Sequence, residues 1–137
     1  MGRIVAIDYG QKRTGIAVTD CLKLIANGLK TVSTAELIPF LVDYVVREDV
    51  EKFVVGQPKQ MNNEPSENMK RVEQFVIQLK KHIPSIPVVY YDERFTSKLA
   101  FQAIIDSGIK KKKRQDKALV DEISAVIILQ SYLESIK

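Results

Sequence analysis

The sequence predicts an α/β fold built on a five-stranded mixed sheet, with an antiparallel meander of three strands at its start and helices flanking it. Two short apolar runs, residues 4–7 and 16–18, are joined by a turn that Gly10 and Gly15 bracket, so the runs can pair antiparallel. Helical and strand patterns alternate further along, which requires parallel crossovers. The chain has 137 residues, of which 45% are apolar. We therefore expect residues 1–137 to form a single domain.

The first half of the chain supplies the meander and one helix. Residues 4–7 are apolar on both faces, as in a strand covered on both sides. Residues 24–32 can form the third strand, which Asn27 and Gly28 interrupt as a bulge or a turn. Thr34 is expected to cap the helix that follows.

The second half alternates strands and helices. Apolar residues recur at helical spacing from residue 37 to residue 46, and this spacing predicts one buried helical face. The remaining elements are expected in this order: a buried parallel strand at 53–56, a helix at 66–81, a strand at 88–91, and helices at 96–107 and 117–135.

Composition restricts the chemistry that is available. The formal net charge is +4, and the five basic residues at 110–114 account for more than this net charge by themselves. The positive charge is therefore local, and an anionic partner is expected at one place on the surface. The single cysteine, Cys21, excludes an internal disulfide and fits a reducing compartment. The chain also has a single histidine, His82, so it lacks the residues needed for a zinc site built from histidine and cysteine, and for Ser-His or Cys-His nucleophile pairs. No segment is apolar enough to span a membrane, and we expect a cytoplasmic protein.

Asp8 follows the first strand and is the first candidate for chemistry. It should lie at the carboxyl end of a central strand, the edge where open α/β sheets bind ligands. The alternative is an ordinary turn-forming aspartate. Asp20 ends the returning strand, which carries it on the order of 15 to 20 Å from Asp8, so it more simply closes a turn.

Asp92 and Glu93 end the last strand and are adjacent. Their side chains point to opposite faces, so only one can share a site with Asp8, and the pattern does not choose between them. The alternative is a solvated pair that uses Arg94 as its partner.

The last helix adds a third acid. Asp121 shares a face with Ser124 and Ala125, small residues that would let the helix approach the sheet closely, whereas Glu122 is rotated off this face and is expected in solvent. Three acids from separate elements, without histidine or cysteine, suit hard cations such as Mg²⁺ or Mn²⁺. Two such ions would support phosphodiester cleavage.

Basic residues flank the proposed acidic edge, and a row of cations beside a metal site fits a nucleic-acid substrate. The alternative for residues 110–114 is a solvated linker. The candidate nucleic-acid-binding residues are Lys12, Arg13, Lys59, Arg94, Lys98, Lys110, Lys111, Lys112, Lys113 and Arg114.

Four motifs, in order along almost the whole chain, resemble the YqgF (RuvX) family. They are DYGQKRTGIA at 8–17, VVGQP at 54–58, DERFTS at 92–97 and VDEISAVIILQ at 120–130. The family is described as Holliday junction resolvases or nucleases of the 16S ribosomal RNA precursor, with a ribonuclease H-like fold. The chain departs from it at Gln57, where the family usually has Leu, and in the loop that follows.

The resemblance implies a metal-dependent endonuclease, with processing of the 5′ end of pre-16S rRNA as the leading expectation and resolution of Holliday junctions as the alternative. The family's acidic triad falls on Asp8, Glu93 and Asp121, as catalytic residues and as ligands of Mg²⁺ or Mn²⁺. Its basic pair falls on Lys12 and Arg13. The implied partner is structured RNA or branched DNA, bound by a monomer or a homodimer.

Two other functions fit parts of the pattern. A sugar-kinase or actin-type nucleotide site also begins with Asp-x-Gly, but those enzymes close two lobes around ATP. A non-catalytic nucleic-acid-binding module would bind in a salt-sensitive way without metal-dependent cleavage.

Overall fold

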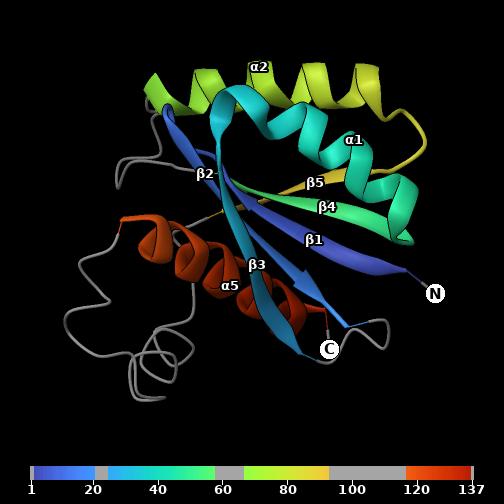
Figure 1. The fold of residues 1–137 in the computed structure, drawn as a ribbon. Coiled ribbons are helices and arrows are strands. Elements are labelled where there is room, and N and C mark those ends of the chain that lie inside the picture. The colour runs from blue at the N-terminus through green and yellow to red at the C-terminus, as the bar shows by residue number, and fades with distance from the viewer. Residues whose placement is uncertain (1, 21–24, 58–66, 93–116, 137) are drawn as a thin grey trace.

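A five-stranded mixed sheet forms the centre of the structure, as Figure 1 shows for this computed structural model. The strands lie in the order β3-β2-β1-β4-β5. They are β1 (Arg3–Asp8), β2 (Arg13–Thr19), β3 (Ala26–Ser33), β4 (Val50–Gln57) and β5 (Val88–Asp92). The structure describes residues 2–20, 25–57, 67–92 and 117–136, with 67–68 and 117–121 described by their backbone only.

The two halves of the sheet differ in strand direction, as the sequence predicts. β2 pairs antiparallel with both β1 and β3, while β1, β4 and β5 are parallel neighbours. The register between β2 and β3 shifts so that Leu29 has no opposite residue, which confirms the irregularity expected at Asn27 and Gly28.

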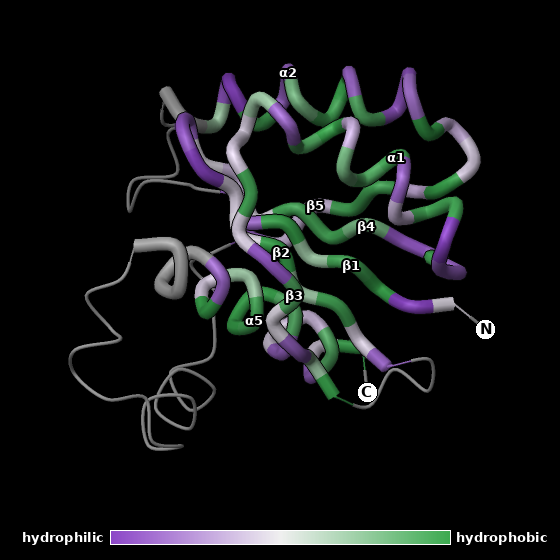
Figure 2. The backbone as a smooth tube through the Cα atoms, viewed as in Figure 1, coloured by the Kyte–Doolittle hydropathy of each residue, from purple (hydrophilic) through white to green (hydrophobic). Residues whose placement is uncertain are grey.

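Helices cover the two faces of this sheet. The 3₁₀ turn η1 (Thr34–Glu36) leads into α1 (Leu37–Arg47), and α1 and α2 (Glu67–His82) lie on one face, whereas α5 (Lys117–Ser135) lies on the other. Hydrophilic residues gather on the outer side of α2, and apolar residues run along the central strands (Figure 2). The expected helix at 96–107 lies outside the described residues.

Alternating side chains of β1 divide the interior into two cores. Val5 and Ile7 pack with the residues of α1 and α2, whereas Ile4 and Ala6 pack with those of α5. On the α5 face, Ala6 meets Ala17 and Ala125, all fully buried. The close approach predicted from small helix residues is therefore confirmed at Ala125.

Thr34 does not cap a helix, and that expectation was wrong. Neither η1 nor α1 has a side-chain hydrogen bond from its capping residue. The Thr34 hydroxyl instead donates to the carbonyl oxygen of Gly10 at 2.7 Å. Because the Thr34 hydroxyl is bonded to Gly10 in the turn after β1, it does not cap the helix.

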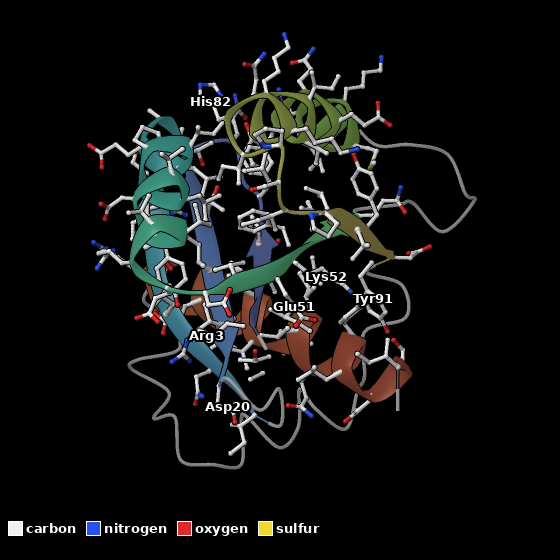
Figure 3. The ribbon with its side chains drawn as sticks, turned by 90° about the vertical axis from the view of Figure 1, so that its right-hand side faces the viewer. Arg3, Asp20, Glu51, Lys52, His82 and Tyr91 are labelled. Atoms are coloured by element: carbon white, nitrogen blue, oxygen red, sulfur yellow. The ribbon has the colours of Figure 1, made fainter. Side chains whose placement is uncertain are left out.

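The amino end of β1 is closed by polar contacts away from the proposed site. The Asp20 carboxylate accepts from the backbone N–H of Ile25 at 3.0 Å, so Asp20 closes a turn as predicted. Beside it, the Arg3 guanidinium donates to the carbonyl oxygen of Thr19 at 2.9 Å (Figure 3). Among the described helices, none is long and apolar enough to cross a membrane.

Candidate nucleic-acid cleavage site

The carboxyl ends of the three parallel strands share one edge of the sheet. Ile7 lies beside Val55 in the register of β1 and β4, and Gln57 lies beside Asp92 in that of β4 and β5. The amino end of α5 begins at this same edge (Figure 1). The convergence predicted for Asp8, the 56–58 bend and Asp92 is therefore confirmed for its described members.

Asp8 lies on the face of the sheet that α5 covers. It continues the alternation in which Ile4 and Ala6 pack against α5, and it is half-buried at the end of β1. Across the antiparallel pair it lies opposite Gly15, which has no side chain to fill the space beside the carboxylate. Asp8 is thus an acid presented toward the start of α5.

Asp92 lies on the opposite face from Asp8. The alternate residues Val89 and Tyr91 belong to the core under α5, and the Tyr91 ring meets that of Tyr132 edge-on, with centroids 6.2 Å apart. Tyr132 is held by Lys52, whose ammonium donates to the Tyr132 hydroxyl at 2.8 Å. Asp92 follows Tyr91 and therefore points toward the α2 side. Glu93 lies outside the described residues.

Asp121 belongs to the first turns of α5, where the structure describes its backbone. Its neighbour Glu122 is half-buried, and its carboxylate lies where a Cβ at position 28 would stand. The expectation that Glu122 is in solvent was therefore wrong. Gly28 leaves the space in β3 that this side chain occupies.

The turn that carries Lys12 and Arg13 is fixed by a closed set of hydrogen bonds. Thr34 donates to the Gly10 carbonyl, and a hydroxyl has one proton, so at their 2.9 Å contact the buried Thr14 hydroxyl donates to Thr34. The Gly10 N–H donates to Thr14 in a long bond of 3.5 Å. Both cations are exposed and are thus presented on a fixed turn.

Gly10 is required where this turn closes. A Cβ on Gly10 would collide with the backbone carbonyl oxygen of Arg13, which no side-chain rotation can relieve. The backbone N–H of Thr34 also donates to the carbonyl oxygen of Lys12 at 2.9 Å. The sequence reasoning missed the role of Thr14 and Thr34, because their contact joins segments whose spacing gives no pattern.

The other sequence-predicted site residues are not described. The structure brings together the positions of Asp8, Lys12 and Arg13 at one edge, with Asp121 on the helix that starts there. No group of three metal-ligating side chains occurs within the described ranges, to which Glu93 and the Asp121 side chain do not belong. The basic residues outside them are Lys59, Arg94, Lys98, Lys110, Lys111, Lys112, Lys113 and Arg114.

Local charge is visible in the tyrosine next to Asp92. Burial, and then the carboxylates of Glu134 and Asp92, raise the pKa of the Tyr91 phenol above its ordinary value. The phenol therefore stays neutral well above pH 7.

Solved structures of the same fold define the class of the domain. Thermus thermophilus RuvC in complex with a Holliday junction substrate superposes with a TM-score of 0.65 at 16% identity, covering 99% of this chain and 96% of that one. A second Thermus thermophilus RuvC structure gives 0.60 at 15% identity, covering 97% and 96%. The fold is ribonuclease H-like, as the resemblance implied.

Sequence comparison gives the family. Residues 2–135 match the RuvX family model, described as Holliday junction resolvase, and the chain belongs to this family. A Parabacteroides distasonis protein is 70% identical over 137 residues, covering 100% of this chain and 98% of its own. A Phocaeicola vulgatus protein is 66% identical over 137 residues, covering 100% and 99%. Both carry the name "Putative pre-16S rRNA nuclease", and the chain is an enzyme of this nuclease family.

Proposed function

We propose that this chain is a metal-dependent endonuclease that cleaves phosphodiester bonds in the 5′ region of the 16S ribosomal RNA precursor. The observation that carries the proposal is the edge where β1, β4 and β5 end, with Asp8 directed to the face on which α5 begins. The names of relatives 70% and 66% identical over the whole chain support the choice of substrate. An enzyme acting on precursor ribosomal RNA would work in the cytoplasm.

The proposed catalytic acids are Asp8, Glu93 and Asp121. The phase of β5 supports Glu93 over Asp92, because Asp92 lies on the face away from Asp8 and α5. The carboxylates of these three residues would hold Mg²⁺ or Mn²⁺, and their all-oxygen donor set fits hard cations. Such ions supply charge stabilisation at the scissile phosphate and favour ionisation of the attacking water.

Lys12 and Arg13 have the proposed role of holding the substrate backbone. Both are exposed on the turn that directly follows Asp8, so a phosphate bound there stays close to the acid. The bonds of Thr14 and Thr34 keep this turn in one geometry, and a fixed cation loses less freedom when it binds. The same role is proposed for Lys59, Arg94, Lys98 and residues 110–114.

A cleavage assay that compares the wild type with two matched variants, Asp8→Asn and Asp20→Asn, tests this function. Purified protein is incubated with a precursor RNA that contains the 5′ leader, with Mg²⁺ or Mn²⁺ and then with excess chelator. We expect metal-dependent cleavage, which Asp8→Asn lowers by about 10²-fold to 10⁴-fold. Asp20→Asn is the control, because Asp20 closes a turn at the far end of the sheet. Absence of cleavage, or cleavage unchanged by Asp8→Asn, contradicts the proposal.

Resolution of Holliday junctions is the second candidate. It is favoured by the family description and by the RuvC fold. Cutting two strands of a junction symmetrically requires two sites related by a two-fold axis, whereas cutting one RNA strand requires a single site. Light scattering together with cleavage of a four-way DNA junction distinguishes the two, since a resolvase must be a dimer under cleavage conditions.

A further inference from the structure

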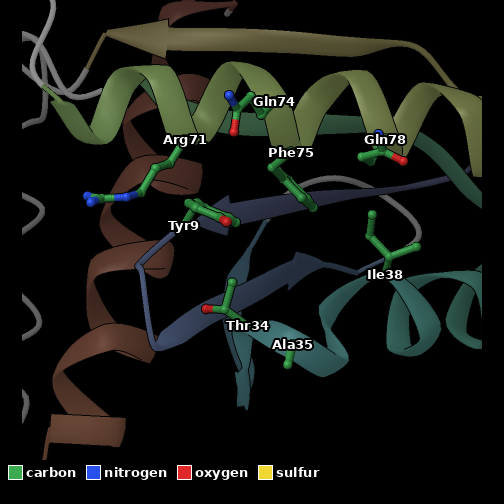
Figure 4. A pocket seen from close by; sticks show the side chains of 8 residues that line it. All are labelled: Tyr9, Thr34, Ala35, Ile38, Arg71, Gln74, Phe75 and Gln78. Carbon is green, nitrogen blue, oxygen red and sulfur yellow. The ribbon is translucent and has the colours of Figure 1, made fainter.

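A pocket of about 300 Å³ opens beside the end of β1, between α2 and the approach to α1 (Figure 4). It lies on the face of the sheet away from α5, so it is separate from the proposed metal site. Its principal lining residues are Tyr9, Thr34, Arg71, Gln74, Phe75 and Gln78. The volume is at the lower end of the range for small-molecule sites, about 300 to 1,000 Å³, and can hold a single planar group but no duplex.

The pocket is next to the proposed cleavage site. Tyr9 directly follows Asp8, so the pocket begins one residue along the chain from the proposed metal site. The alternation of β1 directs Asp8 toward α5, whereas Tyr9 packs against the core under α2. A strand that crosses the edge at Asp8 can therefore place a neighbouring base on the Tyr9 side.

An aromatic pair forms one wall. The rings of Tyr9 and Phe75 are stacked, with centroids 5.0 Å apart and planes 24° from parallel. Phe75 is buried at 6% exposure and holds Tyr9 in place. A rigid ring at the border of a pocket is the surface on which unpaired bases stack.

Polar side chains of α2 line the pocket beside Phe75, which belongs to the same helix. Gln74 and Gln78 are one helical turn apart and line the same pocket. Each amide offers donors and an acceptor, which match the hydrogen-bonding edges of a base. Arg71, one turn before Gln74, adds a guanidinium that can stack on a base or bind its phosphate.

We propose that this pocket binds one unpaired nucleobase of the RNA substrate, adjacent to the phosphate that is cut. The inference rests on the proposed nuclease function and adds to it a requirement for an unpaired nucleotide beside the cleavage point. Stacking on Tyr9 supplies affinity, and the amides of Gln74 and Gln78 supply preference among bases.

Fluorescence of 2-aminopurine tests the stacking directly. Short single-stranded RNAs carry the analogue at successive positions and are bound in the presence of chelator, so no cleavage is needed. We expect quenching at one position and about five- to hundredfold weaker binding by Tyr9→Leu, as base stacking predicts. Tyr90→Leu is the matched control, because Tyr90 is a partly exposed tyrosine outside the pocket.

Two further measurements separate base binding from a loss of folding. With an abasic nucleotide at the quenched position, the wild type and Tyr9→Leu should bind equally. Gln74→Ala and Gln78→Ala alter exposed side chains and should change base preference without changing the salt dependence of binding. If no position is quenched, or if Tyr9→Leu and Tyr90→Leu weaken RNA binding equally, the proposal that the pocket binds a base is wrong. Failure of cleavage alone overturns the proposed function instead.

Discussion

The side-chain oxygens of Thr14 and Thr34 lie 2.9 Å apart, and this contact ties the turn after β1 to the approach to α1. Thr14 is fully buried, so water cannot replace the bond. The position of Lys12 and Arg13 thus depends on η1, a segment that is distant from them in the sequence. Mutation can separate this positioning from stability.

Thr14→Val should reduce both stability and RNA binding. The change keeps the shape of the side chain but removes the hydroxyl that donates to Thr34 and accepts the long bond from the Gly10 N–H, which costs about 1 to 3 kcal/mol of unfolding free energy. Thr19→Val is the matched control, since the buried Thr19 hydroxyl accepts from the Ile4 N–H at the other end of the sheet. Urea unfolding should give comparable losses, while only Thr14→Val weakens RNA binding. Equal RNA binding by the two variants would show that the bond does not position the cations.

Glu93→Gln should abolish cleavage, whereas Asp92→Asn should leave most of it. Asp92 lies on the face away from Asp8, so its charge is not expected to reach the metals directly. We expect a loss of at least about 10²-fold for Glu93→Gln and less than about tenfold for Asp92→Asn. The measurement is the single-turnover rate at saturating Mg²⁺. The reverse order of effects would move the third acid to Asp92.

Neutralising Lys12 and Arg13 together should lower the salt dependence of RNA binding. Each phosphate contact contributes a slope of about −0.7 on single strands, so the double Gln variant should lose about 1.4 from the slope. Lys80→Gln with Lys81→Gln is a control of equal charge, in the last turn of α2. Titrations at several salt concentrations give the slopes. A similar change in both variants would mean that net charge, rather than the turn, binds the RNA.

Gly28→Ala should be destabilising in the wild type and neutral or stabilising once Glu122 is removed. The new Cβ collides with the Glu122 side chain, which is flexible, so we expect a cost of about 1 kcal/mol. In the Glu122→Ala background the collision disappears, and replacing glycine then lowers the entropy of the unfolded chain, worth about 0.4 to 1 kcal/mol. A double-mutant cycle by urea unfolding measures the coupling. Additive effects would rule out the close contact.

The sequence predicted the strands, their directions and the edge at Asp8, because apolar alternation and turn residues are local signals. It left Asp92 and Glu93 open, since the phase of a short strand depends on what it packs against. Here Tyr132 of α5 fixes that phase by contacting Tyr91. Thr34 was misassigned because its bonding partner lies in another segment.

The pocket was also beyond local reasoning. Tyr9 and Phe75 come from distant parts of the chain, and each alone has the pattern of a core residue. Only the packing of α2 over the end of β1 brings Gln74 and Gln78 to the same place.

The parallel pairing of β1 with β4, and the docking of α5 on the opposite face, join segments that lie far apart in the sequence. Such contacts close long loops, and this cost in entropy makes their formation slow compared with that of local hairpins and helices. Asp8 and Asp121 would therefore meet only when the chain is fully folded. A molecule in which α5 has not docked would present the basic turn at Lys12 and Arg13 but would lack the proposed cleavage site.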